Sequence, residues 1–114
     1  LAYSSEQQAE FGHMEASSLL HYRAGEGKYD LHTDWSVKTP RQFSAVLYLN
    51  DVEIGGQTYF PNLDLKIEPV AGRLILFPAN YAYVHQALPP LSGDKFAMVT
   101  WFSQRIDVEE YYGN

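Results

Sequence analysis

Cysteine is absent from this chain of 114 residues. Its absence excludes a disulfide framework, a thiolate metal site and a cysteine nucleophile, so any metal must be held by nitrogen and oxygen atoms. Basic residues are also few, because 8 Lys and Arg stand against 14 Asp and Glu and give a net charge of −6. This acidic balance argues against a nucleic-acid partner and against an anionic membrane surface.

Long apolar runs are missing as well. The longest, around Leu74 to Phe77, is far shorter than the roughly 20 residues that a helix needs to cross a bilayer. No basic segment followed by an apolar run opens the sequence. We therefore expect no membrane association and a cytoplasmic location. The start at Leu1 instead of a methionine is compatible with a piece of a longer protein.

The content of apolar and aromatic side chains predicts a packed globule. Hydrophobic residues make up 46% of the chain and aromatic residues 15%, which is more than a disordered segment carries. A chain of this length has room for one core. We therefore expect a single domain that spans residues 1–114.

Short strands dominate the predicted secondary structure. Residues 5–16 are the one stretch that favours a helix, and from Ser18 onward apolar runs alternate with Gly, Pro and Asn. The predicted strands are Leu19–Arg23, Tyr29–Thr33, Phe43–Leu49, Gln57–Phe60, Leu65–Glu68, Arg73–Phe77, Tyr83–Ala87 and Lys95–Ser103. This spacing favours a sandwich or barrel of Greek-key type. Because the last strand carries bulky apolar residues on both faces, we expect both faces to be covered.

The tripeptide His32-Thr33-Asp34 places an imidazole and a carboxylate on one face of a predicted strand. The two side chains could therefore converge on one ion. A chain of this composition contains about 0.2 such pairs by chance. Taken alone, the pair is also consistent with a strand-end histidine that is hydrogen-bonded to a surface aspartate.

A second histidine and a lysine extend this pattern. If the predicted strands on either side of Leu88–Asp94 form a hairpin about Pro90, His85 lies directly opposite Lys95 and both point into the interior. A lysine inside a β-barrel is costly unless it meets an anion. That anion is either a protein carboxylate or the carboxylate of a ligand.

Two histidines and one carboxylate form the facial triad of non-heme iron(II) oxygenases. Zinc could use the same ligands. A zinc hydrolase, however, would need a nearby general base, and the sequence contains no HExxH helix.

Four segments carry a resemblance to a known family: HYRAGEGKYDLHTDW, LYLNDVEIGGQTYFP, AGRLILFP and HQALPPLSGDKFAMVTWF. In this order they resemble the 2-oxoglutarate/iron(II) oxygenase superfamily and, within it, the prolyl 4-hydroxylase-like group. The shared pattern is a tyrosine upstream of HxD, a YLN…GGxTxFP segment, a distal histidine and a lysine ten residues after it. The resemblance extends from about Ser18 to Phe102. It implies a mainly β fold, a double-stranded β-helix (jelly roll) with a minor N-terminal helix.

The resemblance also implies roles for individual residues. His32, Asp34 and His85 would ligate Fe(II), and Lys95 would bind the distal carboxylate of the cosubstrate 2-oxoglutarate. The remaining implied cosubstrate residues are Tyr22, Thr58 and Trp101. Tyr22 could be displaced, because the Gly25–Gly27 stretch is one residue longer than the family's spacing, and Thr58 could be an ordinary β-branched strand residue. O2 is the co-reactant, succinate is a product, and ascorbate is a further candidate cofactor.

The substrate that the resemblance favours is a proline in a peptide or protein. One departure is the short connection Ser36–Gln42, where peptide-acting members would have a long lid. Lys38 and Arg41 in this connection could steer an acidic partner. The alternatives are an oxygenase of a small molecule or nucleobase, and a non-catalytic jelly-roll binding module, against which the complete triad and Lys95 argue.

Overall fold

The computed structural model describes residues 13–36 and 40–103. The strands in these ranges are β1 (His13–Met14), β2 (Ser18–Tyr22), β3 (Tyr29–His32), β4 (Arg41–Tyr48), β5 (Thr58–Phe60), β6 (Leu65–Ile67), β7 (Leu74–Pro78), β8 (His85–Ala87) and β9 (Lys95–Ser103). Two single 3-10 turns accompany them, η1 (Pro61–Leu63) and η2 (Tyr81–Tyr83). The predicted mainly β fold is confirmed. No helix in the described ranges is long and apolar enough to cross a membrane.

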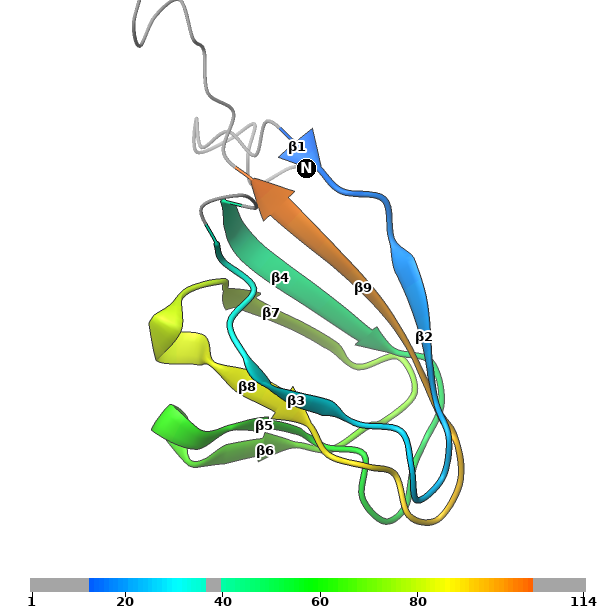
Figure 1. Ribbon diagram of the computed structural model, residues 1–114. Coiled ribbons are helices and arrows are strands. Elements are labelled where there is room, and N and C mark those ends of the chain that lie inside the picture. The colour runs from blue at the N-terminus through cyan, green and yellow to red at the C-terminus, as the bar shows by residue number, and fades with distance from the viewer. Residues whose placement is uncertain (1–12, 37–39, 104–114) are drawn as a thin grey trace, which may run out of the picture.

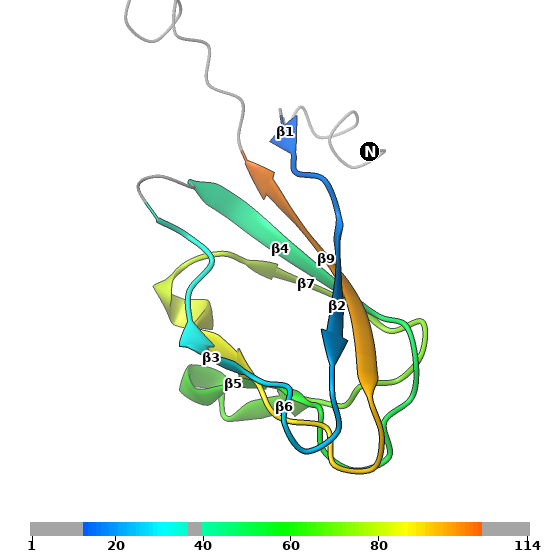
Figure 2. The ribbon, with the colours of Figure 1, turned by 45° about the vertical axis from the view of Figure 1, so that its right-hand side comes forward.

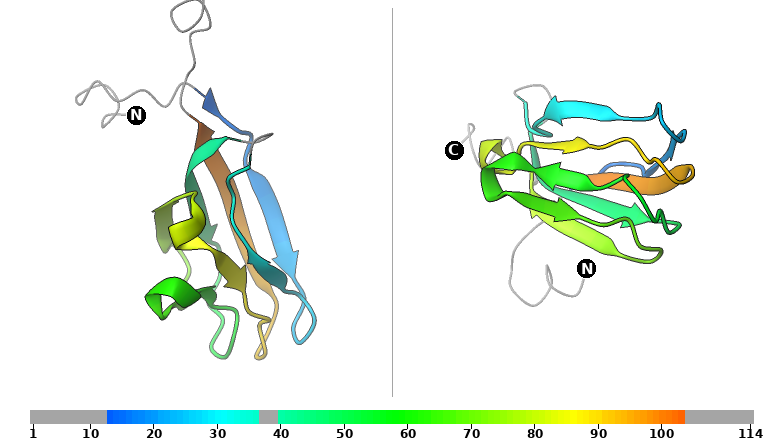
Figure 3. Two further views of the ribbon diagram at one scale, coloured as in Figure 1. Left: turned by 60° about the vertical axis from the view of Figure 1, so that its left-hand side comes forward. Right: turned by 90° about the horizontal axis from the view of Figure 1, so that it is seen from below.

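The strands form two antiparallel sheets that face each other (Figure 1). The five-stranded sheet has the order β1-β9-β4-β7, and β2 also pairs with β9 (Figure 2). The four-stranded sheet has the order β3-β8-β5-β6. Seen from below, the four-stranded sheet lies in front of the five-stranded sheet (Figure 3, right). The space between the two layers is where inward-pointing side chains meet.

Alternation along β9 decides which side chains enter that space. Lys95 and Ala97 are buried, whereas Phe96 and Met98 are 36% exposed. The register carries the same alternation to β4, where Tyr48 lies opposite Ala97 and is fully buried. A strand residue and its directly opposed partner share a face, so the inner side of this sheet includes polar as well as apolar groups.

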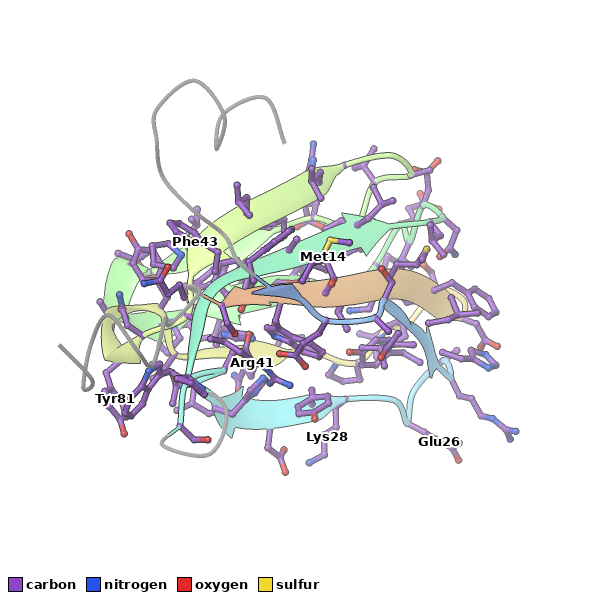
Figure 4. The ribbon with its side chains drawn as sticks, turned by 90° about the horizontal axis from the view of Figure 1, so that it is seen from above. Met14, Glu26, Lys28, Arg41, Phe43 and Tyr81 are labelled. Atoms are coloured by element: carbon purple, nitrogen blue, oxygen red, sulfur yellow. The ribbon has the colours of Figure 1, made fainter. Side chains whose placement is uncertain are left out.

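The outer face of the five-stranded sheet is exposed, contrary to the expectation that both faces are covered. Leu74 and Leu76 of β7 are 62% and 61% exposed, and Leu19 of β2 is 65% exposed. Figure 4 looks onto this face, with Met14 and Phe43 labelled. Within the described residues, the core therefore lies on the inner side alone.

The predicted helix over residues 5–16 is wrong where the structure describes it. His13 and Met14 form a strand that pairs with Ser103 and Phe102, and the backbone N–H of Glu15 donates to the carbonyl of Trp101 at 2.9 Å. Pairing with the end of a long strand supplies the hydrogen bonds that a helix would otherwise make. Residues 5–12 of this prediction lie outside the described residues.

The predicted hairpin between His85 and Lys95 is also wrong. His85 pairs with His32 in the four-stranded sheet, and Lys95 pairs with Tyr22 in the five-stranded sheet. The connection between β8 and β9 crosses from one sheet to the other. Its backbone bonds are made to another loop, since the N–H of Leu91 donates to the carbonyl of Ile54 at 2.8 Å. The predicted register placed residues 85 and 95 opposite each other because both are equally far from Pro90. The contacts of the loop prevent that pairing.

Candidate functional site

A cavity of about 520 Å³ lies between the two sheets. The four-stranded sheet and its adjoining loop contribute His32, Asp34, Thr58 and His85 to its lining, and the five-stranded sheet contributes Tyr22, Lys95 and Trp101. The structure therefore brings all seven residues of the sequence-based site together. His85 and Lys95 share this interior although the hairpin expected to unite them does not exist.

His32, Asp34 and His85 form one compact cluster. One ligand atom from each lies within 4.8 Å of the others. His32 Nε2 is 3.1 Å from Asp34 Oδ1, and His85 Nε2 is 3.6 Å from Asp34 Oδ2. The cluster forms because β3 and β8 place the histidines directly opposite each other, while the chain leaving β3 brings the aspartate back toward them.

Both imidazole rings are oriented by backbone carbonyls. The Nδ1–H of His32 donates to the carbonyl of Asp30 at 2.7 Å, and that of His85 donates to the carbonyl of Tyr83 at 3.0 Å. A carbonyl can only accept, so each Nδ1 carries the hydrogen and each Nε2 faces Asp34. Such outer bonds fix the tautomer and orientation of metal-binding histidines.

Protonation in the cluster follows from its geometry. Burial works against the charge of Asp34, but the neighbouring side chains of His32, Ser44, His85 and Trp101 together lower its pKa to about 2. Burial lowers the pKa of His85 and outweighs the opposing effects of Tyr83 and Asp34. Near neutral pH, the cluster thus offers an ionised carboxylate and a neutral imidazole.

Sequence reasoning missed the residue that holds the Asp34 carboxylate most directly. The hydroxyl of Ser44, which is 1% exposed, donates to Asp34 Oδ2 at 2.5 Å. The sequence does contain a sign of this role, because Ser44 stands at an inward position of the otherwise apolar run in β4. A buried hydroxyl requires a hydrogen-bond partner.

Trp101 lies close enough to Asp34 to help lower the pKa of that carboxyl. The guanidinium of Arg41 lies 3.8 Å from the centre of the Trp101 ring. Arg41 itself forms a two-pronged ion pair with Glu15, at 2.7 and 2.9 Å (Arg41 is labelled in Figure 4). Because Glu15 neutralises it, Arg41 offers little charge to an acidic partner. Lys38 lies outside the described residues.

The donor set of the cluster fits a divalent iron ion. Two imidazole nitrogens and one carboxylate, with no further protein carboxylate among the cluster's members, correspond to the facial triad of non-heme iron proteins and leave positions open. The buried, ionised Asp34 supplies the negative charge that a cation needs in such a cavity. Metal binding by these residues remains a prediction.

Lys95 is the unusual group in the cavity. Its side chain is 1% exposed, its ammonium donates to the carbonyl of Gly56 at 2.9 Å, and it lies 4.1 Å from the centre of the Tyr22 ring. Burial lowers the pKa of Lys95 to about 8. Within residues 13–36 and 40–103, no carboxylate forms an ion pair with it. A buried ammonium with spare donors is a ready site for an anion.

The hydroxyls expected beside Lys95 lie within reach of the same cavity. Tyr22 lies directly opposite Lys95 in the register, and the turn that follows it contains Gly25, whose φ is 79°. Burial raises the pKa of Tyr22 to about 12, which keeps its hydroxyl protonated. Thr58 Oγ1 is 2.5 Å from the hydroxyl of Tyr48, a buried neighbour that sequence reasoning did not single out.

Gly56, the second of the paired glycines, lies against the stem of Lys95. Its φ is 76°, and a Cβ atom there would lie 3.2 Å from Pro69 and 3.4 Å from Lys95 Cδ. Only a residue without a side chain adopts this backbone freely and leaves room for the lysine stem. The carbonyl that receives the ammonium is thereby brought close to it.

Comparison with known proteins agrees with this geometry. Residues 17–103 match the family described as the 2OG-Fe(II) oxygenase superfamily. The chain belongs to this superfamily. Within it, the chain is similar to a probable prolyl 4-hydroxylase 9 of Arabidopsis thaliana, with 30% identity over 86% of this chain and 43% of the relative.

Two further relatives place the chain in the prolyl 4-hydroxylase-like group of the superfamily. A putative prolyl 4-hydroxylase of Acanthamoeba polyphaga mimivirus is 37% identical over 57% of this chain and 30% of that protein. The crystal structure of a viral collagen prolyl hydroxylase from Paramecium Bursaria Chlorella virus-1, in complex with 2OG, has a TM-score of 0.76 and 26% identity, over 91% of this chain and 68% of the other. The chain spans less than half the length of the two curated relatives.

Removal of the Ser44 hydroxyl tests the support of the metal cluster. Ser44→Ala deletes a hydrogen bond to Asp34 without adding bulk, so the carboxylate loses a restraint on its orientation. We expect Fe(II) affinity to fall by about 10- to 100-fold, the range for lost outer-shell bonds at metal sites. Anaerobic calorimetric titration with Fe(II) measures it. Ser92→Ala, which removes a hydroxyl bonded to the Ile54 backbone, is the matched control, and equal affinity in both variants would contradict the role of Ser44.

Proposed function

We propose that this chain is the catalytic core of an Fe(II)- and 2-oxoglutarate-dependent dioxygenase that hydroxylates a prolyl residue in a peptide. The observation that supports this most strongly is the presence, in one cavity, of a His-Asp-His cluster and a buried lysine with no carboxylate partner among the described residues. A hydrolytic metal site would use the cluster but would have no need for the lysine. A dicarboxylate cosubstrate needs both.

Each member of the cluster has a defined task in this proposal. His32 and His85 present their Nε2 atoms, already oriented through Nδ1, and Asp34 supplies the anionic oxygen. Iron bound there would supply the oxidising chemistry that couples decarboxylation of 2-oxoglutarate to succinate with hydroxylation of the substrate. The protein contributes ligand geometry and an enclosed space that shields the reaction from water. Ascorbate would serve as an auxiliary reductant.

Lys95 would bind the distal carboxylate of 2-oxoglutarate. In water such a pair contributes little, but the lysine is almost completely buried, and there a charge-assisted hydrogen bond is considerably stronger. The hydroxyls of Tyr22 and Thr58 would donate to the same carboxylate, because both line the cavity and both remain neutral. Tyr48 would orient the Thr58 hydroxyl through their mutual hydrogen bond.

The exposed aromatic residues near the metal cluster suit a proline ring. Tyr29, which is 52% exposed and lines the cavity, has its ring centre 4.6 Å from that of His32 in a tilted arrangement. Trp35, which follows Asp34 in the chain, has its ring centre 6.5 Å from that of Tyr81. A pyrrolidine ring packs well against flat aromatic faces. The names of the relatives, which are prolyl hydroxylases, support the same substrate class.

The proposal is tested first by an anaerobic titration with Fe(II) and then with 2-oxoglutarate. Chelation of the metal by the cosubstrate gives a visible charge-transfer band, and its appearance requires no knowledge of the substrate. We expect a saturable band that is lost in His85→Ala. A folded protein that binds iron but never gives the band would rule out the cosubstrate.

Lys95→Ala separates the two halves of the site. The variant leaves a buried ligand carboxylate without its charge partner, which costs on the order of 2–5 kcal/mol of 2-oxoglutarate binding. Iron affinity should stay the same, because Lys95 does not belong to the cluster. Lys66→Ala, which removes an exposed lysine of β6, is the control. Equal losses of iron and 2-oxoglutarate affinity would contradict the assigned roles.

The affinity for 2-oxoglutarate should also depend on pH. The free protein holds the pKa of Lys95 near 8, below its usual value, because burial disfavours the ammonium. A bound carboxylate favours the charged form, so binding must take up a proton above about pH 8. We expect affinity to be flat just below pH 8 and to fall about tenfold per unit above it. Titrations at saturating Fe(II) measure this slope, which Lys95→Ala should abolish.

A further inference from the structure

Lys95 stands at a point where the main-chain ladder between β4 and β9 ends. The last pair of that ladder is Tyr48 with Ala97, followed by one further bond from the N–H of Leu49 to the carbonyl of Phe96 at 2.9 Å. β4 makes no backbone pair with Lys95, because Lys95 is the first residue of β9 and lies outside the paired part of the β4–β9 ladder. A buried ammonium on a long, flexible stem depends on a well-fixed backbone.

The side chain of Asn50 continues the ladder where the backbone leaves it. Its Oδ1 accepts the N–H of Phe96 at 2.8 Å, and its Nδ2 donates to the carbonyl of Asp94 at 2.8 Å. These two groups belong to the peptide units on either side of the Lys95 Cα. One primary amide therefore binds both peptide units that define the backbone conformation of Lys95.

The other edge of β9 is held as well. Tyr22 of β2 pairs with Lys95, and the carboxylate of Asp94 accepts hydrogen bonds from the N–H of Ala24 at 2.9 Å and from His21 Nε2 at 2.8 Å. Lys95 is thus held by a strand on one side and by a side-chain amide on the other. On the side of β9 that faces Asn50, one side chain makes the hydrogen bonds to both peptide units that flank Lys95.

We propose that Asn50 is a positioning residue for Lys95, which fixes the lysine backbone so that the ammonium meets the cosubstrate carboxylate. This inference rests on the proposed function, since it assigns a consequence to the role of Lys95. The chemistry requires a donor and an acceptor in one short side chain, which an amide provides and a carboxylate does not. Asp at this position would keep the bond from Phe96 but set a negative oxygen against the carbonyl of Asp94.

Asn50→Asp is therefore the sharpest variant, because it keeps size and shape, keeps the acceptor for Phe96, and replaces the donor to Asp94 by a negatively charged acceptor. We expect a loss of 2-oxoglutarate affinity of about 10-fold or more, the lower end of the range for removing an outer-shell bond. Fe(II) affinity should be unchanged. Asn62→Asp is the matched control, because Asn62 is exposed and donates to a different carbonyl, that of Tyr81, at 3.3 Å.

Asn50→Ala gives a second readout that needs neither iron nor cosubstrate. Removing the acceptor should speed hydrogen exchange of the Phe96 amide in the apo protein, and exchange of amides in the centre of β4 should stay slow. This variant also keeps the inference testable if the aspartate variant does not fold. A general loss of protection, with iron and cosubstrate affinity falling together, would show that Asn50 supports the fold at large and would overturn the positioning role.

The double variant Asn50→Asp, Lys95→Ala distinguishes action through Lys95 from an independent effect. If Asn50 acts through Lys95, the aspartate change causes no further loss of 2-oxoglutarate affinity in the Lys95→Ala background. Two results would overturn this inference but leave the proposed function standing. One is a loss of 2-oxoglutarate affinity in the double variant equal to the sum of the two single losses, expressed as free energies. The other is wild-type affinity in Asn50→Asp while Lys95→Ala binds weakly. Wild-type affinity in Lys95→Ala would overturn the proposed anchor and this inference together.

Discussion

The burial of one lysine ammonium is the constraint on which the rest of the cavity depends. Lys95 is 1% exposed and, within the described residues, meets one carbonyl and the aromatic rings of Tyr22 and Tyr48 rather than a carboxylate. Such an arrangement is costly in a protein that has no use for it. Gly56, the register with Tyr22 and the amide of Asn50 all lie against Lys95, an arrangement that supports the proposed role of this charge in binding a ligand.

The two sheets divide the chemistry between them. The four-stranded sheet and its adjoining loop carry the His-Asp-His cluster, in which Asp34 is ionised, and the five-stranded sheet carries the ammonium of Lys95. The division is not complete, because Ser44 and Trp101 reach from the five-stranded sheet to Asp34. A molecule that chelates a metal at one end and bears a carboxylate at the other would bridge the layers. That requirement, more than any single residue, leads to 2-oxoglutarate.

Local pattern and family resemblance predicted the strands and the seven cavity residues, because alternation and motif order are visible along the chain. What failed depended on contacts between distant segments. The hairpin about Pro90 is wrong because its loop is bound to Ile54 instead of closing on itself, and the N-terminal helix is wrong at residues 13–14 because they pair with β9. Ser44 and Asn50 were not found, since their partners lie 10 to 46 residues away.

The central claim is that one molecule engages both halves of the cavity. Its most direct test is the affinity for 2-oxoglutarate measured by calorimetry with and without bound Fe(II), under anaerobic conditions. Since coupling between two ligands is reciprocal, the account predicts that iron tightens 2-oxoglutarate binding and that 2-oxoglutarate tightens iron binding by the same factor. Equal affinity for 2-oxoglutarate in the presence and absence of iron would show that the lysine and the metal cluster serve different ligands.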